Sequence, residues 1–389
     1  MKIPYRAWSE QFSEETLRVV ADVMKSGICY GGRETELFEK ELAEFCETKY
    51  GVATNSGTSA LLLGLLAANI GRDDEVIMAA NVYSGVINAT FAAGARPVLA
   101  EIDERTSNID ASRVEDLITE RTRSIVVQHM YALPADLDPL RRLAEGYDLV
   151  LIEDCAQSLG ARYRGARIGS IGDFGFASVC QKIITVYGPG GILFTHSRDL
   201  ARRVSCLRDQ GHFREENISF IRSRADDWYG MSVPGFQFHM PEAMSAIGRM
   251  HVPMIDKWNS QRRKNAALYT AILGDASLPV QLPVEPEWAT PAYLHYVIKV
   301  DGRDKLRAHL SAAGIETKRI YPIPIHFQPP VKKVTGYKAG DFPVAERDAS
   351  RVLALPVGIH MTEEMIAYVA EEIIRFYEQN VDGMVTSSR

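Results

Sequence analysis

The segment 149–191 predicts both the fold class and a binding site, and it begins with Leu149-Val150-Leu151-Ile152-Glu153-Asp154. Four apolar residues followed by an acidic pair are typical of a parallel strand that is buried on both faces and ends near Asp154. Open α/β sheets bind their ligands at this end of the strands. We therefore expect a ligand site beside Asp154.

The second half of this segment contains a single lysine between two strand patterns. Lys182 follows Phe174-Gly175-Phe176-Ala177-Ser178-Val179 and precedes Gly188-Pro189-Gly190-Gly191 and a further apolar run. A lysine alone among apolar residues and glycines is not expected to be an ordinary solvated charge. The alternative is a surface lysine whose stem lies along apolar neighbours.

Composition excludes several classes of function. The chain has 389 residues, of which 46% are hydrophobic, and a net charge of -6, with Lys and Arg dispersed along the sequence. A nucleic-acid partner is not expected from this balance. No apolar run reaches the ~20 residues of a membrane span, and the first residues do not resemble a signal peptide, so we expect a cytoplasmic protein. Five cysteines without a CxxC pair indicate neither disulfides nor a zinc site, and we expect them to be buried thiols.

Strand and helix patterns alternate from residue 50 to about residue 250, with helical patterns before them. This rhythm predicts an α/β domain, residues 1–250, with a mostly parallel sheet covered on both faces. One of its expected helices spans 111–119. A proline-rich run, residues 279–291, follows a long helical pattern, and a smaller α+β domain is expected within 251–379, including a strand at 316–320. Residues 380–389 are expected to form a disordered tail.

Four features together match what pyridoxal phosphate (PLP) requires. Lys182 could form an imine with the cofactor aldehyde, Asp154 could hold the protonated ring nitrogen, and Tyr83 could stack on the ring. A helix that begins near Thr58 and Ser59 could bind the phosphate through its free N–H groups. Each residue also has a purely structural explanation, as a helix cap, a core aromatic or a surface lysine. Their order along the chain is what favours the cofactor.

Several motifs resemble the PLP-dependent sugar aminotransferases named after DegT, DnrJ and StrS. The resemblance covers nearly the whole chain, from about 10 to 377. The motifs that carry it are Asn55-Ser56-Gly57-Thr58-Ser59-Ala60-Leu61, Ile152-Glu153-Asp154-Cys155-Ala156-Gln157-Ser158-Leu159-Gly160-Ala161, Gly169-Ser170-Ile171-Gly172-Asp173, Tyr321-Pro322-Ile323-Pro324-Ile325-His326-Phe327-Gln328-Pro329 and Gly340-Asp341-Phe342-Pro343-Val344-Ala345-Glu346. The resemblance implies fold-type I, the mostly parallel architecture of this enzyme class.

The resemblance also implies roles for individual residues. Lys182 would bind the cofactor covalently and move the proton, Asp154 would hold the pyridine nitrogen, and Gln157 would lie beside the ring. Tyr83 would stack on the ring. The phosphate would be bound by Gly57, Thr58, Ser59 and Ser178. A homodimer would share its active sites, with Gln237 supplied by the partner subunit. His239 and His326 would border the substrate, and a packed structural histidine is the alternative for His326.

Three departures from the family pattern concern this site. The spacing between Asp173 and Lys182 is one residue short, so that Ala177 takes the position of the family's serine and the role of Ser178 becomes uncertain. Pro189 replaces an acidic residue in a glycine-rich turn. Gln237 and His239 replace an Asn and an Arg, and an imidazole loses its charge above roughly pH 6.5.

The sequence therefore predicts an aminotransferase that moves an amino group from an amino acid, with glutamate expected, to a keto-sugar nucleotide. A ketocyclitol is the alternative acceptor. Two other classes stay open: a PLP-dependent sugar dehydratase, which in this family carries histidine in place of Lys182, and a binding protein that has lost catalysis.

Overall fold

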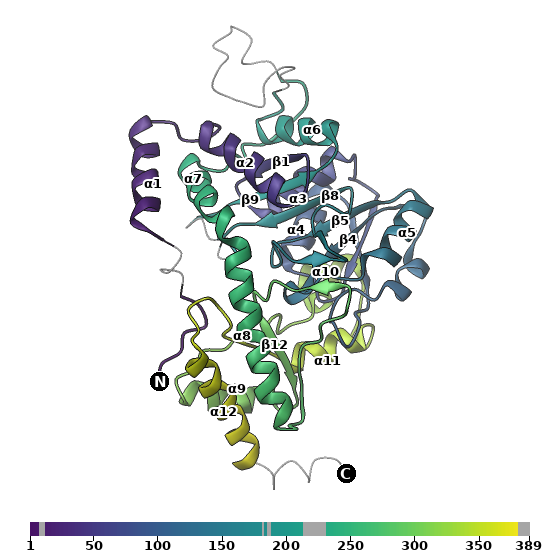
Figure 1. The fold of residues 1–389 in the computed structure, drawn as a ribbon. Helices are drawn as coiled ribbons and strands as arrows, with labels where there is room; N and C mark the ends of the chain where they lie inside the picture. Colours follow the sequence, from purple (N-terminus) through teal and green to yellow (C-terminus); the bar gives the residue numbers. More distant parts are fainter. Residues whose placement is uncertain (8–11, 181–182, 185–187, 213–230, 380–389) are drawn as a thin grey trace.

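A seven-stranded sheet forms the centre of the larger part of the molecule (Figure 1). The computed structural model describes residues 1–7, 12–180, 183–184, 188–212 and 231–379. The sheet has the strand order β1-β9-β8-β5-β4-β2-β3. Its strands are β1 (Tyr50–Thr54), β2 (Glu75–Ala79), β3 (Arg96–Ala100), β4 (Thr122–Gln128), β5 (Val150–Asp154), β8 (Phe174–Ser178) and β9 (Gly191–Thr195). Among these strands only β9 runs antiparallel to its neighbours, which confirms the expected mostly parallel sheet.

Helices cover both faces of this sheet. Every residue of β2 and β9 is buried, and successive side chains of a strand point to opposite faces, so neither face is open to solvent. The helices of this part are α1 (Glu14–Ser26), α2 (Arg33–Phe45), α3 (Gly57–Ala67), α4 (Ser84–Ala93), α5 (Leu137–Tyr147), α6 (Arg198–Arg208) and α7 (Glu242–His251). A two-residue hairpin, β6 (Arg162–Tyr163) with β7 (Ala166–Arg167), pairs with β11 (Ala289–Thr290) outside the main sheet.

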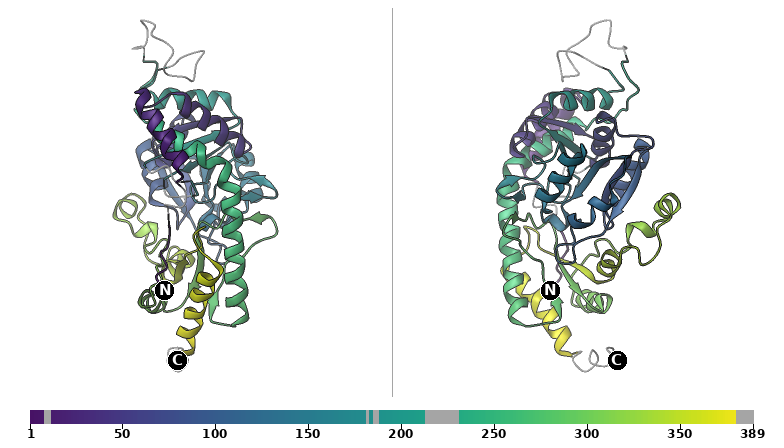
Figure 2. Two further views of the ribbon diagram at one scale, coloured as in Figure 1. Left: turned by 60° about the vertical axis from the view of Figure 1, so that its left-hand side comes forward. Right: turned by 90° about the vertical axis from the view of Figure 1, so that its right-hand side faces the viewer.

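A second hydrophobic cluster surrounds a small antiparallel sheet. The sheet consists of β10 (Val280–Gln281), β12 (Tyr296–Val300) and β13 (Val352–Leu355), and the helices that contribute to this cluster are α8 (Ile255–Asp275), α9 (Arg303–Ala312) and α12 (Glu363–Gln379). Two further helices, α10 (Pro329–Thr335) and α11 (Pro343–Arg351), place Val331 and Ala345 in the large cluster. Both views of Figure 2 show α8, in green, running along one side of the molecule. Ile255 belongs to the large cluster, whereas Tyr269 and Leu273 belong to the small one, so this helix packs in both cores.

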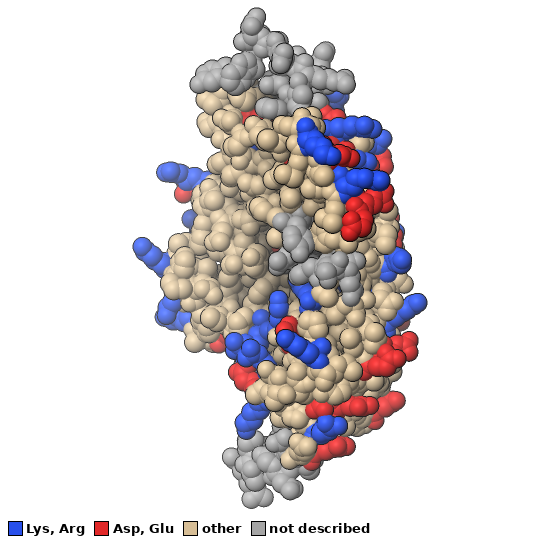
Figure 3. Space-filling view, turned by 90° about the vertical axis from the view of Figure 1, so that its left-hand side faces the viewer, with Lys and Arg blue, Asp and Glu red and all other residues tan. Residues whose placement is uncertain are grey.

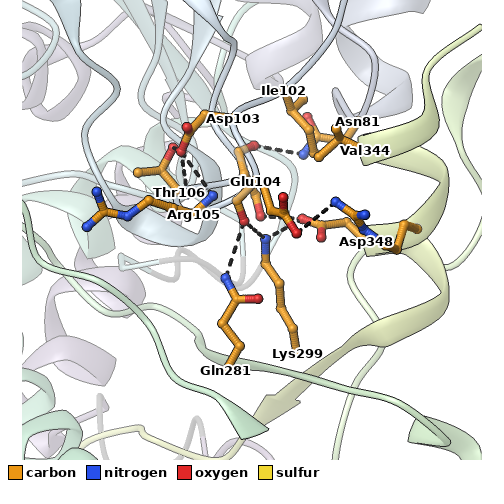
Figure 4. A network of polar contacts seen from close by, with 12 residues as sticks. Asn81, Ile102, Asp103, Glu104, Arg105, Thr106, Gln281, Lys299, Val344 and Asp348 are labelled. Atoms are coloured by element: carbon orange, nitrogen blue, oxygen red, sulfur yellow. Dashed lines mark hydrogen bonds and ion pairs between the residues drawn. The ribbon is translucent and has the colours of Figure 1, made fainter. Parts of the chain in front are cut away.

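A buried polar network joins the two parts (Figure 4). The ammonium of Lys299 on β12 lies 2.6 Å from the carboxylate of Asp348 on α11 and donates to the carbonyl of Glu104, which follows β3. Gln281 on β10 donates to the same carbonyl over 3.3 Å. Lys299 and Asp348 are both buried, and buried charges of this kind need their partners. The network therefore connects the small sheet to the loop that follows β3 of the large sheet.

Two predicted elements are wrong. The helix expected at 111–119 consists of two 3₁₀ turns, Ala111–Arg113 and Glu115–Leu117, because Asp110 closes the first turn by accepting from the N–H of Ser112 and Ile118 is already extended. The strand expected at 316–320 makes only an isolated bridge, between Lys318 and Ala354. The predicted tail, 380–389, lies outside the described residues.

The cysteines only partly meet the expectation of buried thiols. Cys46, Cys155 and Cys206 are buried. Cys29 is exposed because it lies in the turn between α1 and α2, and Cys180 is half-buried. In the described part of the chain, none of the helices combines the length and the apolar character needed to cross a membrane.

Candidate active site

A cavity of about 360 Å³ lies where β4, β5 and β8 end. This volume falls within the usual range of small-molecule sites. Six residues predicted from the sequence line it together: Gly57, Thr58, Tyr83, Asp154, Gln157 and Ser178. Lys182 lies outside the described residues, although Cys180, two positions before it, lines the cavity. Pro189, which departs from the family pattern, lines it as well.

Strand register brings the polar groups of the sheet edge together. Gln128, the last residue of β4, pairs with Asp154, the last residue of β5, and Asp154 pairs with Phe176 of β8. The Asp154 carboxylate is buried and accepts from the N–H of Ala156 over 2.9 Å. Gln128 accepts from the N–H of Tyr83 over 2.9 Å, which fixes the start of α4 at the cavity. A buried carboxylate at a strand end can hold a cationic ring N–H of a ligand.

The N-terminus of α3 also lines the cavity. Ser56 caps the helix by accepting from the N–H of Ser59. The Ser59 hydroxyl donates to Asn55 over 2.7 Å, and Ser59 is not among the residues that line the cavity, whereas Thr58 is. A helix N-terminus with free N–H groups and a threonine hydroxyl is suited to bind a phosphate.

The position of Ser178 settles which residue of β8 faces this helix. Ser178 lines the cavity beside Gly57, while Ala177 is fully buried in the core. The shortened spacing before Lys182 therefore leaves a serine at the cavity. Gly191 of β9 makes this close packing possible, because a Cβ there would lie 2.2 Å from the backbone carbon of Ser56.

The neighbouring carboxylate, Glu153, points away from the cavity and has a structural role. It lies 3.2 Å from His129 and accepts from the N–H groups of Gly169, Ile171 and Gly172. Burial alone would raise the pKa of Glu153, but His129 and these amides outweigh it, and the pKa is lowered. Glu153 thus holds the turn between β7 and β8 behind the sheet edge.

The other wall of the cavity comes from segments far apart in the sequence. Tyr321 accepts from the Gln157 amide over 2.7 Å, and its ring centroid lies 5.7 Å from that of Tyr83. Burial first, and then the charge of Asp154, raise the pKa of Tyr321 far above its usual range, so the phenol stays protonated. Arg6, near the N-terminus, lines the cavity beside it.

Sequence reasoning missed five polar residues that line the cavity: Arg6, Ser56, Gln128, Cys180 and Tyr321. Tyr321 stands in a motif that was quoted for the resemblance, and Gln128 ends a recognisable strand, so both had a signal. Arg6 had none.

Three other predicted residues lie away from this cavity. His326 is fully buried, lies 3.0 Å from Glu346 and packs against Phe342. Gln237 accepts from Gln210, and His239 lies 3.2 Å from Asp209. None of them is among the described residues that line the cavity.

The residues present fit PLP. In the described part of the chain, Oε1 of Gln157 is a buried atom without a hydrogen-bond partner, and Gln157 lines the cavity. Such an orphaned oxygen needs a partner from a ligand, and the NH₂ group of the same amide, which donates one hydrogen to Tyr321, has a second hydrogen to donate. A carboxylate, an aromatic face and a helix N-terminus surround it.

Comparison with known proteins identifies the family. A family model described as the DegT/DnrJ/EryC1/StrS aminotransferase family matches residues 10–374. The chain belongs to this family. It is therefore a PLP-dependent aminotransferase of fold-type I, as the sequence predicted.

Individual relatives of this DegT/DnrJ/EryC1/StrS aminotransferase match it over nearly its whole length. The dTDP-3-amino-3,4,6-trideoxy-alpha-D-glucose transaminase of Streptomyces venezuelae is 36% identical, over 98% of this chain and 97% of the relative. The crystal structure of S. venezuelae DesV in complex with a ketimine intermediate has a TM-score of 0.90 and 35% identity, covering 97% of this chain and 99% of DesV. NtdA from Bacillus subtilis with bound cofactor PMP has a TM-score of 0.84 and 26% identity, covering 96% of this chain and 85% of NtdA.

Proposed function

We propose that this chain transfers the amino group of L-glutamate to the ketone of a nucleotide-linked keto-sugar. One observation carries the proposal: a single cavity joins a phosphate-type helix N-terminus, a buried carboxylate, an orphaned amide oxygen and Cys180, which stands two positions before Lys182 in the sequence. The relative that is 36% identical is named as a transaminase of a dTDP-linked sugar, which supports a nucleotide-linked acceptor over a ketocyclitol.

The cavity residues would divide the work by position. Thr58, Ser178 and the N–H groups of α3 would bind the cofactor phosphate, and Asp154 would hold the protonated ring nitrogen. Gln157 would orient the ring by a hydrogen bond to the phenolic oxygen of the cofactor. When bound, PLP supplies an electron-withdrawing ring that lowers the cost of removing the α-proton of the donor.

The remaining two roles concern the ring face and the proton. Tyr83 would cover one face of the ring and exclude water from it. Lys182 would bind the cofactor covalently before reaction, and its released amine would move the proton from the donor to the cofactor. If the apolar neighbours of Lys182 in the sequence also surround its amine, they would favour the neutral form that this step needs.

We also propose a homodimer in which residues 235–240 approach the partner's cavity. Figure 3 shows the side of the molecule that carries α1, where a broad area lacks Lys, Arg, Asp and Glu side chains. Leu17 and Met24 of α1 are exposed, and apolar side chains of this size are often covered in oligomers. Gln237 and His239 would then serve the partner's substrate site, and His326, which is buried here, would shape a site wall through its contact with Phe342.

The test of the proposed reaction is transfer of labelled nitrogen. The protein is incubated with ¹⁵N-glutamate and dTDP- or UDP-linked keto-sugars, and the products are analysed by mass spectrometry, with a ketocyclitol in a parallel reaction. We expect a ¹⁵N-labelled amino-sugar nucleotide and an equal amount of 2-oxoglutarate. Lys182→Ala should give neither, whereas the exposed control Lys257→Ala should react normally.

Each rival function predicts a different product. Labelled aminocyclitol without amino-sugar would move the assignment to the ketocyclitol class. Loss of a sugar hydroxyl without nitrogen transfer would indicate a dehydratase. Cofactor binding without any product would indicate a binding protein.

A further inference from the structure

Arg6 reaches the cavity from an N-terminal segment that is fixed to the C-terminal part of the chain. Ile3 donates its N–H to Gly314 and accepts from the N–H of Glu316, each over 2.9 Å. The Tyr5 N–H donates to the Glu316 carboxylate over 3.1 Å, and the Tyr5 side chain is buried. The backbone just before Arg6 is therefore anchored, so the position of this arginine is built into the fold.

The Arg6 side chain is also supported by its neighbours. Its guanidinium carbon lies 5.5 Å from the centroid of the Tyr5 ring, and Nη2 lies 3.5 Å from Nε2 of His295. Because a guanidinium only donates, Nε2 must be the accepting nitrogen. Nδ1 of His295 then carries the proton and donates to the Tyr5 hydroxyl over 2.7 Å. Tyr5 and His295 together hold the guanidinium at the cavity wall.

Arg6 gives this wall a positive charge that the rest of the described cavity lining lacks. Among the described residues that line the cavity, it is the only Lys or Arg, and no described histidine lines it. Burial lowers the pKa of Arg6, and the phenols of Tyr5 and Tyr321 act in the opposite direction. A guanidinium nevertheless stays protonated in proteins. A fixed cation thus lies beside Tyr321. The phosphate is proposed to bind elsewhere in the cavity, at the start of α3.

We propose that Arg6 binds the α-carboxylate of the amino-acid donor. This assignment rests on the proposed function. The α-carboxylate is bonded directly to the carbon that loses its proton, so it must lie inside the cavity close to the cofactor. The diphosphate of a nucleotide-linked sugar is separated from the reacting carbon by the sugar ring and reaches further out. The planar fork of an arginine matches a carboxylate with two parallel hydrogen bonds.

The test measures binding without turnover. The probe is 2-methyl-L-glutamate, which has no α-hydrogen, and its dissociation constant is read from the absorbance of the bound cofactor. We expect Arg6→Gln to weaken binding about 10- to 100-fold, the loss of a charge-assisted contact, and Arg6→Lys to weaken it less. Cofactor content should be unchanged in both. Arg113→Gln, an exposed arginine outside the cavity, is the matched control and should bind like the wild type.

A second probe separates donor from acceptor. Binding of dTDP and UDP, measured by calorimetry, should be the same in the wild type and Arg6→Gln. A loss of nucleotide binding with unchanged binding of 2-methyl-L-glutamate would assign Arg6 to the acceptor and overturn the proposal. Equal binding of 2-methyl-L-glutamate by wild type and variant would overturn it as well. If the wild type itself fails to bind this probe, the proposed donor is wrong, and the role of Arg6 falls with it.

Discussion

The two walls of the cavity differ in how the chain builds them. The sheet wall, with Asp154 and Gln128, consists of residues at the ends of neighbouring parallel strands. The terminal wall, with Arg6 and Tyr321, combines residues more than 300 positions apart in the sequence. Parallel strands bring their ends to one edge by topology alone, whereas the terminal wall depends on contacts such as the bridge between Ile3 and Ile315. Strand patterns in the sequence can therefore reveal the first wall, but they do not show that Arg6 and Tyr321 meet in the second.

The largest expected effect comes from the carboxylate of the sheet wall. Asp154→Asn removes the charge that would hold the protonated ring nitrogen, while keeping the size of the side chain. We expect the rate of the glutamate half-reaction to fall on the order of 100-fold or more, measured by stopped-flow absorbance. Asp148→Asn is the control, because this exposed residue ends α5 in a left-handed conformation that Asn also adopts. A loss of less than tenfold would show that the sheet wall does not set the chemistry.

The support behind the sheet wall should be needed for stability. In Glu153→Gln one carboxylate oxygen becomes an NH₂ group, which would face either His129 or the backbone N–H groups. Two hydrogen-bond donors would then face each other in the core, and neither would have an acceptor. We expect the free energy of unfolding to fall by about 3 kcal/mol, measured in urea. Glu145→Gln, on the exposed side of α5, should change it by less than about 0.5 kcal/mol.

The same residue predicts the pH dependence. The folded pKa of Glu153 is lowered, so its stabilisation is fully present above the pKa of the unfolded chain, near 4.3, and is lost as the pH falls through the folded value. The difference between wild type and Glu153→Gln should stay constant above about pH 5.5 and shrink below about pH 4. A difference that grew in acid would contradict this.

The terminal wall should contribute less to the rate. Tyr321→Phe removes the phenol that accepts from Gln157, which leaves a buried amide without its partner. We expect kcat/KM for glutamate to fall about tenfold, the effect of one buried unsatisfied donor. Tyr147→Phe, an exposed tyrosine outside the cavity, should have no effect. If Tyr321→Phe lowers the activity with glutamate as much as Asp154→Asn does, the two walls are equally important for catalysis.

The smallest effects should separate two neighbours at the start of α3. Thr58 faces the cavity, whereas the Ser59 hydroxyl is engaged with Asn55. Thr58→Val should weaken PLP binding roughly fivefold, the loss of one hydrogen bond, and Ser59→Ala by less than about twofold. Fluorescence titration of the apoprotein with PLP measures both. Equal losses would place the Ser59 hydroxyl in the phosphate site after all.

The sequence predicted the sheet wall because its residues follow apolar strands, whose pattern is local. It left open whether Ser59 binds a ligand or belongs to a helix cap, and whether His326 borders the substrate or packs in the core, since both depend on side-chain packing. The 3₁₀ turns at 111–117 replaced a helix because one side chain, Asp110, closes the first turn. Arg6 was out of reach because nothing near it in the sequence shows that Ile3 pairs with a segment more than 300 residues away.

The absorbance spectrum of the purified protein tests the central claim most directly. Spectra of the wild type and of Lys182→Ala are recorded before and after addition of L-glutamate. The account predicts a visible absorbance band from the cofactor in the wild type that disappears when glutamate is added, and no such response in Lys182→Ala. A wild-type protein without this band when PLP is supplied, or a Lys182→Ala protein that responds like the wild type, would contradict the roles assigned to Lys182 and to the cavity.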